Sequence, residues 1–542
     1  MDLEQQTIPG LVQAAAGRWG DSVAVEDNAD GEITYRRLAD DMMVASRAFI
    51  AAGVNKGDRV AVWAPNSYRW IAAALGLQAA GAVLVTLNTR LKGGEAGYIL
   101  ANSGARVLLT VNGFLGTDYT ALLVDALDGA ARDGGEEGTR RPVAGLPALE
   151  RVLLLDGPPT PGADGWQDFL AGADGVSEQQ ARERLDELGG DDLSDLLFTS
   201  GTTGKPKGVM TAHGQNLRAF ESWSEVVGLR EGDRYLVVNP FFHSFGYKAG
   251  WLASFMRGAT VLPETVFDVA RVLERIERDR VSMLPGPPTL YQGLLSHPGL
   301  AQHDLSSLRL AVTGAAVIPV ELVERMRDEL GFDTVITGYG LTETCGIVTM
   351  CRFDDDPETI ATTSGRAIPG VDVMCVGRMG DELPRGEPGE VVVRGYNVMR
   401  GYFDDPAATD ETITNGWLHT GDVGVMDERG YLKITDRMKD MFIMGGFNCY
   451  PAEIENLMAA NADLAQVAVV GVPDERMGEV GVAFVVLAEG SDLTSEAVVA
   501  WCRENMANYK VPRRVELVGD LPMNASGKVV KYQLRERVAG LR

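Results

Sequence analysis

The sequence has few features of a cross-linked, zinc-binding or membrane-spanning protein. Its five cysteines are odd in number and scattered over 542 residues, and no Cys-x-x-Cys pair or His/Cys cluster occurs. This spacing argues against a disulfide framework and a zinc site. No apolar run reaches the roughly 20 residues of a membrane helix. Residues 1–6 lack a basic-then-apolar signal pattern, so we expect a cytoplasmic protein.

Basic residues are also scarce. The chain has 50 Lys and Arg against 76 Asp and Glu, a formal net charge of −26. Such a surface repels phosphate backbones overall, which argues against a nucleic-acid partner. At 542 residues the chain is long for one hydrophobic core, so two or more domains are predicted.

One basic, glycine-rich stretch stands out against this acidic background. Residues 199–208 read Thr-Ser-Gly-Thr-Thr-Gly-Lys-Pro-Lys-Gly and lie between short apolar runs, which predicts strand, loop, strand. Glycines let backbone N–H groups approach a ligand, while the hydroxyls, Lys205 and Lys207 add donors and charge. This suits a polyphosphate, although a polar hairpin without a ligand would look similar locally. Pro206 after the Gly-Lys pair excludes a Walker loop.

The rest of the N-terminal part alternates helices with apolar strands. A helix over 34–52 capped by Thr34 precedes a strand at 59–63, and a helix over 68–80 precedes a strand at 82–86. This alternation predicts parallel βαβ units. The pattern repeats with a helix over 266–278, strands at 281–284 and 308–312, and a helix from Pro319. Residues 128–146 and 157–165 are predicted surface loops.

Two further stretches suit a nucleotide and an apolar ligand. Residues 239–250 interleave aromatics, glycines and His243, which predicts an apolar pocket with a polar entrance, though a lone histidine can equally serve structure. In 337–344, Tyr339 stands between two glycines and offers a face for a base, worth roughly 1–3 kcal/mol. Thr342 and Glu343 offer oxygen ligands for Mg²⁺, although a solvated loop glutamate would look the same.

The C-terminal part differs from the N-terminal part in its predicted elements. Residues 371–403 look strand-rich. Asp422 ends the motif 417–422, and its carboxylate can accept hydrogen bonds from both hydroxyls of a ribose. Strands at 466–471 and 482–488, a helix that begins at Pro451 and another near 494–505 predict a small α+β module.

These motifs, in this order, resemble those of the adenylate-forming superfamily, which comprises acyl-CoA synthetases, luciferases and the adenylation domains of peptide synthetases. The resemblance covers essentially the whole chain. It implies an α/β fold with a large N-terminal domain, 1–436, made of stacked α/β sheets and a small β-rich subdomain. A small, mobile α+β C-terminal domain, 437–542, would follow a hinge at Lys439.

The resemblance also assigns site residues. The catalytic residues it implies are Lys528, Glu343, Thr199 and His243, with Glu343 and Thr199 as metal ligands. The nucleotide and CoA contacts it implies are Ser200, Gly201, Thr202, Thr203, Gly204, Lys207, Gly314, Ala315, Ala316, Tyr339, Gly340, Thr342, Asp422, Arg437, Gly445 and Gly446. The substrate-pocket residues it implies are Phe245, Gly246, Tyr247, Lys248, Trp251 and Gly338.

The implied chemistry is a two-step ligation that uses ATP, Mg²⁺ and coenzyme A. A carboxylate attacks the α-phosphate of ATP, Lys528 stabilises that step, and rotation about Lys439 then admits the CoA thiol past Gly445 and Gly446. Peptide-synthetase domains place an aspartate inside the aromatic motif to bind an ammonium group. Residues 241–251 contain no acid, so an α-amino acid is disfavoured.

The stretches 239–250, 284–292 and 436–455 most resemble actinobacterial CoA ligases for the steroid-derived indanedione propanoate. A bulky polycyclic acid, steroid- or terpenoid-derived, is therefore the predicted substrate, with a medium- or long-chain fatty acid second. Three alternatives stay open: an enzyme specialised for thioesterifying a preformed adenylate, a carrier-protein loading ligase, and a non-catalytic nucleotide-binding protein. The expected partners are small molecules, and a homodimer is left open.

Overall fold

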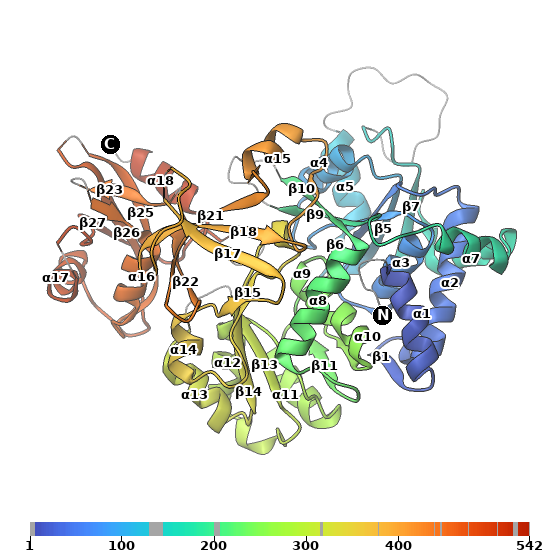
Figure 1. Cartoon of the computed structure of the whole chain (residues 1–542), viewed down its shortest axis with the longest axis horizontal. Coiled ribbons are helices and arrows are strands. Elements are labelled where there is room, and N and C mark those ends of the chain that lie inside the picture. Colours follow the sequence, from blue (N-terminus) through green and yellow to red (C-terminus); the bar gives the residue numbers. More distant parts are fainter. Residues whose placement is uncertain are drawn as a thin grey trace. The chain divides into compact units, whose positions relative to one another are not determined.

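The computed structural model describes residues 6–128, 145–199, 206–314, 318–377, 379–437, 440–444, 447–474, 476–506, 508–523 and 529–540. The chain divides into two compact units (Figure 1). The first comprises Met1–Asp372 and Arg394–Gly416, and the second comprises Val373–Val393 and Trp417–Arg542. The sequence-based boundary at 436/437 falls within the second unit and stays a prediction. Within the described ranges, no helix is long and apolar enough to cross a bilayer.

The first unit contains a largely parallel sheet with the strand order β19-β10-β9-β4-β3-β5-β7-β8, and β6 pairs with β5. Its strands are β3 (Arg59–Trp63), β4 (Val83–Thr86), β5 (Val107–Phe114), β6 (Thr117–Asp118), β7 (Arg151–Asp156), β8 (Asp164–Gly165), β9 (Leu193–Thr199), β10 (Lys207–Ala212) and β19 (Gly401–Tyr402). β3 pairs in parallel with β4 and β5, and β4 pairs in parallel with β9. The predicted βαβ units are confirmed.

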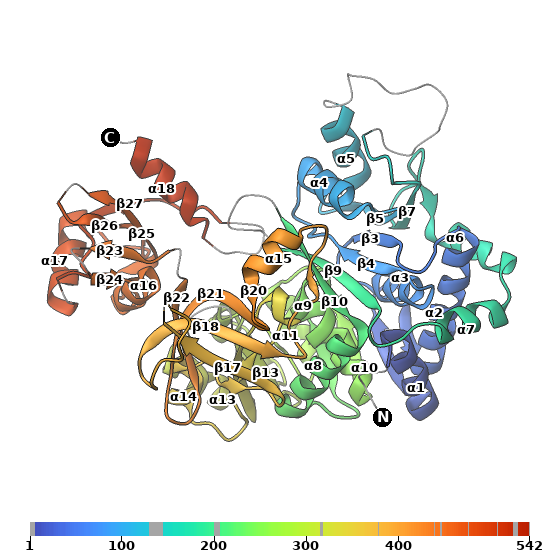
Figure 2. The ribbon, with the colours of Figure 1, turned by 45° about the horizontal axis from the view of Figure 1, so that its top comes forward.

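Helices accompany this sheet, and Figures 1 and 2 show α2 and α3 beside it. The helices of this region are α1 (Ile8–Trp19), α2 (Tyr35–Ala51), α3 (Tyr68–Ala79), α4 (Gly93–Ser103), α5 (Tyr119–Asp128), α6 (Trp166–Ala171), η1 (Gly172–Gly175) and α7 (Glu178–Asp186). Thr34 caps α2 as predicted, since its hydroxyl accepts a hydrogen bond from the Arg37 amide at 3.2 Å. The predicted loop 157–165 ends in β8, and residues 129–144 of the other predicted loop lie outside the described ranges.

A second sheet of the same unit has strand groups β11-β12-β1-β2 and β13-β14-β15-β16. Its strands are β1 (Val23–Asp27), β2 (Gly31–Thr34), β11 (Arg234–Val237), β12 (Thr260–Pro263), β13 (Leu310–Gly314), β14 (Thr334–Tyr339), β15 (Thr349–Met350) and β16 (Arg366–Ala367). The remaining elements of the unit are α8 (His213–Val227), α9 (Ser244–Gly246), the π-helix η2 (Tyr247–Leu252), α10 (Ala253–Arg257), α11 (Val269–Arg278), α12 (Pro288–Leu295), η3 (Leu300–Gln302), α13 (Val320–Asp328), η4 (Thr342–Thr344), α14 (Pro357–Thr362), α15 (Pro406–Thr412) and β20 (Ile413–Thr414).

The strand predicted at 281–284 is wrong as a full strand. Only Met283 forms bridges, in parallel, to Tyr235 of β11 and Leu310 of β13. Pro285 has no N–H to donate, so the pairing with β11 ends at Met283. Toward β13, the Leu284 amide still donates to the Leu310 carbonyl at 3.0 Å and the Gly286 amide to the Val312 carbonyl at 3.0 Å. Met283 nevertheless joins the two strand groups of the second sheet.

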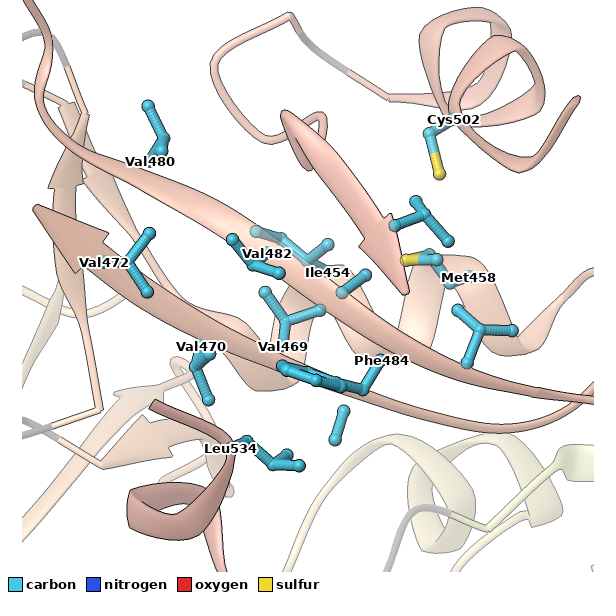
Figure 3. Packing of buried hydrophobic residues seen from close by; sticks show 14 of the residues in the cluster. Ile454, Met458, Val469, Val470, Val472, Val480, Val482, Phe484, Cys502 and Leu534 are labelled. Atoms are coloured by element: carbon cyan, nitrogen blue, oxygen red, sulfur yellow. The ribbon is translucent and has the colours of Figure 1, made fainter. Parts of the chain in front are cut away.

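The second unit has two antiparallel-rich sheets. Its strands and helices are β17 (Val371–Val376), β18 (Pro388–Gly395), β21 (Trp417–Met426), β22 (Leu432–Arg437), β23 (Phe442–Met444), β24 (Phe447–Cys449), α16 (Pro451–Ala459), β25 (Leu464–Asp474), β26 (Gly478–Leu487), α17 (Ser495–Asn505), β27 (Arg514–Leu517) and α18 (Lys531–Gly540). One buried apolar cluster contains Ile454 and Met458 of α16, Val469 and Phe484 of the central strands, and Leu534 of α18 (Figure 3). The predicted α+β module and its helix start at Pro451 are confirmed.

Candidate adenylation site

The glycine-rich stretch connects two paired strands. β9 and β10 are antiparallel, and their register places Thr199 opposite Lys207 at the loop end. Leu196, Leu197 and Val209 are buried, so apolar packing fixes the base of this hairpin. The loop itself, 200–205, lies outside the described ranges. The roles of Ser200, Gly201, Thr202, Thr203 and Gly204 therefore remain predictions.

One end of the hairpin is tied to Glu343 through Tyr402. The Tyr402 hydroxyl donates to Glu343 Oε1 at 2.9 Å, and Lys207 Nζ lies 4.9 Å from the centroid of the Tyr402 ring. Backbone pairing holds this arrangement, because Tyr402 of β19 lies opposite Val209 of β10. The Met399 amide also donates to the Glu343 carbonyl at 2.8 Å. The structure thus brings together Lys207, Thr199 and Glu343, which are far apart in sequence.

This arrangement suits a carboxylate that holds a cation beside phosphates. Burial, followed by the charge of Glu343, raises the pKa of the Tyr402 hydroxyl well above its usual value, so Tyr402 stays a neutral donor to the Glu343 carboxylate. Within the described ranges, no group of three or more His, Cys, Asp or Glu side chains could hold a metal ion. Mg²⁺ needs only one or two protein carboxylates together with substrate phosphates, and Glu343 with the Thr342 and Thr199 hydroxyls fits that donor set.

The candidate adenine-binding residues follow the carboxyl ends of two parallel strands. Gly314 at the end of β13 lies opposite Gly338 of β14, one residue before Tyr339. Ligands of α/β sheets bind at this edge. A Cβ built on Gly340 would lie 2.3 Å from the carbonyl oxygen of Gly346, so the turn after Tyr339 requires glycine. Ala315 and Ala316 lie outside the described ranges.

The aromatic motif packs against the Glu343 loop. A Cβ on Gly346 would lie 2.8 Å from the Ser244 side chain, so the two loops are in close contact. The exposed His243 caps α9, and its Nδ1 accepts from the Phe245 amide at 3.2 Å. Gly246 allows the backbone to pass Pro240, whose carbonyl oxygen would lie 2.2 Å from a Cβ. His243 is therefore accessible and oriented by its own helix end.

The predicted pocket residues differ in exposure. Phe245 is half-buried, whereas Tyr247, Lys248 and Trp251 are fully buried. The Tyr247 and Trp251 rings stack at 4.7 Å, and Lys248 Nζ forms an ion pair with Asp195 Oδ1 at 3.0 Å. Their contact with a substrate stays a prediction, and Lys248 has its charge compensated within the protein.

The remaining predicted residues belong to the second unit. Asp422 is 4% exposed on β21 and lies opposite Arg437 of β22 in the antiparallel register. Lys439, Gly445, Gly446 and Lys528 lie outside the described ranges, so their assignments remain predictions.

Sequence reasoning missed Tyr402 and Asp195. Tyr402 reaches Glu343 only through the pairing of β10 with β19, and nothing local in the sequence signals that pairing. Asp195 did leave a signal, since a carboxylate inside the apolar strand 193–198 needs a buried partner. Lys248, a cation inside an apolar aromatic run, is that partner.

The hairpin that carries Lys207 and Thr199 lies beside Glu343, and Tyr339 lies at a sheet edge, an arrangement that suits the binding of a nucleotide. The AMP-binding enzyme family matches residues 12–403, and the C-terminal domain of AMP-binding enzymes matches residues 453–528. The chain therefore belongs to the AMP-binding enzyme family. It is an ATP-dependent, AMP-forming acid–thiol ligase that uses ATP, Mg²⁺ and coenzyme A.

Two relatives resemble the chain over nearly its whole length. The 3-[(3aS,4S,7aS)-7a-methyl-1,5-dioxo-octahydro-1H-inden-4-yl]propanoyl:CoA ligase of Rhodococcus jostii is 49% identical over 99% of both chains. The ligase of the same name from Mycobacterium tuberculosis is 48% identical over 98% of this chain and 99% of its own. Among solved structures, the anthranilate CoA ligase AuaEII in complex with anthranoyl-AMP is 27% identical, with a TM-score of 0.83 over 99% of this chain and 98% of its own. The predicted superfamily and fold class are confirmed.

Proposed function

We propose that this ligase activates a bulky polycyclic propanoate-type acid, steroid- or terpenoid-derived, as an acyl-adenylate and transfers the acyl group to CoA. The observation that supports this substrate class is the near-50% identity, over almost the full length, to two ligases named for an indanedione propanoyl group. The motif at 239–250 supports it as well, because its lysine is paired internally with Asp195, it is rich in aromatic and small residues, and it contains no Asp or Glu. An ammonium-bearing acid would find no carboxylate there.

The described residues have distinct tasks in the first half-reaction. The acid's oxygen attacks the α-phosphorus of ATP and pyrophosphate leaves. Lys207 would contribute positive charge beside the phosphates of ATP. The hydrogen bond from Tyr402 would keep the Glu343 carboxylate directed toward the same phosphates. Glu343 would hold Mg²⁺, which neutralises charge on the leaving pyrophosphate when bound. Tyr339 would offer its ring to the adenine.

The second half-reaction exchanges one acyl bond for another. The CoA thiolate attacks the carbonyl carbon of the acyl-adenylate, the acyl–oxygen bond breaks, and AMP leaves with that oxygen. Gly445 and Gly446 would line the path of the pantetheine arm, and Lys528 would serve only the first half-reaction.

We also propose a cytoplasmic location, with small molecules as the partners. Light scattering after size-exclusion chromatography would test whether the chain forms a homodimer.

A competition experiment tests the substrate class. The purified chain is given ATP, Mg²⁺, CoA and equimolar indanedione propanoate, decanoate, hexadecanoate and an aromatic α-amino acid, and acyl-CoA products are measured by mass spectrometry. We expect kcat/KM for the polycyclic acid to exceed that for each competitor by roughly 10²-fold, as apolar pockets discriminate by shape. A preference for a fatty acid would replace the proposed substrate class by the second one.

Two further outcomes separate the remaining alternatives. Product from synthetic acyl-adenylate and CoA, without product from acid and ATP, would show an enzyme specialised for thioesterification. Acyl transfer to a phosphopantetheinyl carrier protein, with none to free CoA, would show a loading ligase.

A further inference from the structure

A fully buried polar cluster surrounds Asp195 in the first unit, and its members include residues of both hairpin strands and of the aromatic motif. We call it the Asp195 cluster; its members are Gln78, Ser194, Asp195, Thr211, Asn216, Tyr247 and Lys248. All seven side chains are buried.

The carboxylate of Asp195 is the centre of this cluster. Lys248 Nζ lies 3.0 Å from Asp195 Oδ1 and donates to Thr211 Oγ1 at 3.0 Å. The Thr211 hydroxyl donates to Oδ1 at 2.6 Å, while the Ser194 hydroxyl donates to Oδ2 at 2.7 Å. Asn216 Nδ2 donates to Oδ2 at 2.7 Å. Lys248 is the one cation among these partners, so its loss would leave a buried anion uncompensated.

The cluster joins the elements that build the two halves of the adenylation site. Asp195 and Thr211 belong to β9 and β10, whose loop ends hold Thr199 and Lys207. Lys248 belongs to the π-helix η2, which also contains Tyr247 and Trp251 of the predicted acyl pocket. Gln78 of α3 donates to the Tyr247 hydroxyl at 3.0 Å and to the Ser194 carbonyl at 3.1 Å. Gln78 therefore forms a second link between η2 and β9.

Two physical arguments indicate that this ion pair does more than stabilise the fold. Apolar residues of similar volume would stabilise a buried site as well or better, because desolvation offsets most of the attraction between buried charges. The pair therefore suits a task that requires directional bonds. A π-helix is a rare conformation that recurs at functional sites, and Lys248 bonds this one to both strands of the hairpin.

We propose that Lys248 and Asp195 are positioning residues for adenylation. Their ion pair holds η2 at a fixed place relative to the base of the β9–β10 hairpin, so that the acid bound by the aromatic motif meets the α-phosphate in line. This inference rests on the proposed function. It adds the residues that fix where the acid lies relative to the α-phosphate. Both side chains are fully buried, so we expect them to act through η2 and the hairpin and not by touching the reacting atoms.

The test uses the full chain and compares variants of two buried ion pairs. Lys248→Met and Asp195→Asn each remove one charge, and the double variant removes both. Arg275→Met is the matched control, since Arg275 is 2% exposed and pairs with Glu264 at 2.8 Å and with Asp279 at 2.8 Å on and beside α11. Melting temperature and acid-dependent ATP–pyrophosphate exchange are measured for each variant, with the acid that the parent uses best, at a temperature well below every melting transition.

We expect both single variants to lower kcat/KM for the acid roughly 10²-fold, as a misplacement of about 1 Å can. The KM for ATP should change little. The double variant should regain the melting temperature that the single variants lose, but it should not regain kcat/KM for the acid. It also keeps the test valid if a single variant does not fold. Arg275→Met should lose melting temperature and keep the acid kcat/KM.

Two results would overturn the inference while leaving the proposed function intact. One is an active parent whose double variant regains stability and acid kcat/KM together. The other is an Arg275→Met variant that loses acid kcat/KM to the same degree as Lys248→Met. A parent that adenylates no acid would instead overturn the proposed function, and this inference with it.

Discussion

At the scale of single residues, the hydrogen bond from Tyr402 to Glu343 gives a prediction about metal binding. We predict that Tyr402→Phe lowers the rate of adenylation about tenfold or somewhat more, because a hydrogen bond to a charged group is worth about 1.5–3 kcal/mol. The KM for Mg²⁺ should rise at the same time, since the carboxylate loses its fixed direction. Mg²⁺ titrations of ATP–pyrophosphate exchange measure both effects.

Tyr396→Phe is the matched control for this variant. Tyr396 is half-buried in the same segment and bonds Ser222 at 3.1 Å and the Pro369 carbonyl at 3.1 Å, away from Glu343. An unchanged Mg²⁺ dependence in Tyr402→Phe would show that Glu343 is oriented by other contacts, or that it does not hold the metal.

His213, at the start of α8, gives a prediction about acid stability. It is 1% exposed, its Nδ1 accepts from the Ile8 amide at 3.3 Å, and burial lowers its pKa from 6.5 to about 4. Between these two values the unfolded chain binds a proton that the folded chain does not. The free energy of unfolding should therefore fall as pH drops from 6.5 toward about 4, by up to roughly 3 kcal/mol from this residue.

His213→Asn removes the titrating group and retains an acceptor for the Ile8 amide. Urea unfolding measured between pH 7 and about 4 should show a flatter pH dependence for the variant than for the parent. Parallel curves would mean that His213 takes up its proton in the folded state.

At the scale of elements, the turn between β14 and η4 depends on close backbone packing. Gly340→Ala would place a Cβ 2.3 Å from the Gly346 carbonyl oxygen, so Tyr339 and Glu343 would have to move. We expect adenylation to fall roughly 10²-fold and the melting temperature to drop. Exchange assays and thermal unfolding report the two effects.

Gly17→Ala is the control for a glycine substitution. Gly17 lies inside α1 with nothing within 4 Å of a Cβ, so alanine should stabilise the chain by about 0.5–1 kcal/mol without a change in activity. A Gly340→Ala variant as stable and active as the parent would show that this turn can shift without effect on the site.

The elements were largely predictable from the sequence because their signals are local. Apolar runs with turn residues between them predicted β3, β9 and β10, Pro451 predicted the start of α16, and Thr34 predicted the start of α2. The strand predicted at 281–284 is reduced to the bridges of Met283, because Pro285 has no N–H to extend the pairing with β11. Tyr402 and the partner of Lys248 were out of reach, since both contacts join strands distant in sequence.

At the scale of the whole molecule, the superfamily resemblance implies that Lys528 serves only adenylation and Gly446 only thioester formation. Both residues lie outside the described ranges, so this separation is a prediction from the resemblance. Lys528→Ala should lower acyl-adenylate formation roughly 10²–10³-fold, as loss of one preorganised donor does. The same variant should convert synthetic acyl-adenylate to acyl-CoA at close to the parent rate, as measured by mass spectrometry.

Gly446→Trp is the complementary variant. It should keep ATP–pyrophosphate exchange and lose conversion of the synthetic adenylate, because the bulky ring would obstruct the pantetheine arm. Equal loss of both steps in Lys528→Ala would contradict an alternation of the C-terminal domain between two tasks.

The most direct test of the central claim follows the oxygen atoms of the acid. If the carboxylate attacks the α-phosphorus and AMP later leaves with the bridging oxygen, an acid labelled with ¹⁸O on both carboxylate oxygens must transfer one label to AMP. The other label must stay in the thioester carbonyl. Mass spectrometry of one turnover with ATP, Mg²⁺ and CoA should therefore show singly labelled AMP and singly labelled acyl-CoA, with unlabelled pyrophosphate. Label in inorganic phosphate together with ADP would contradict the acyl-adenylate route.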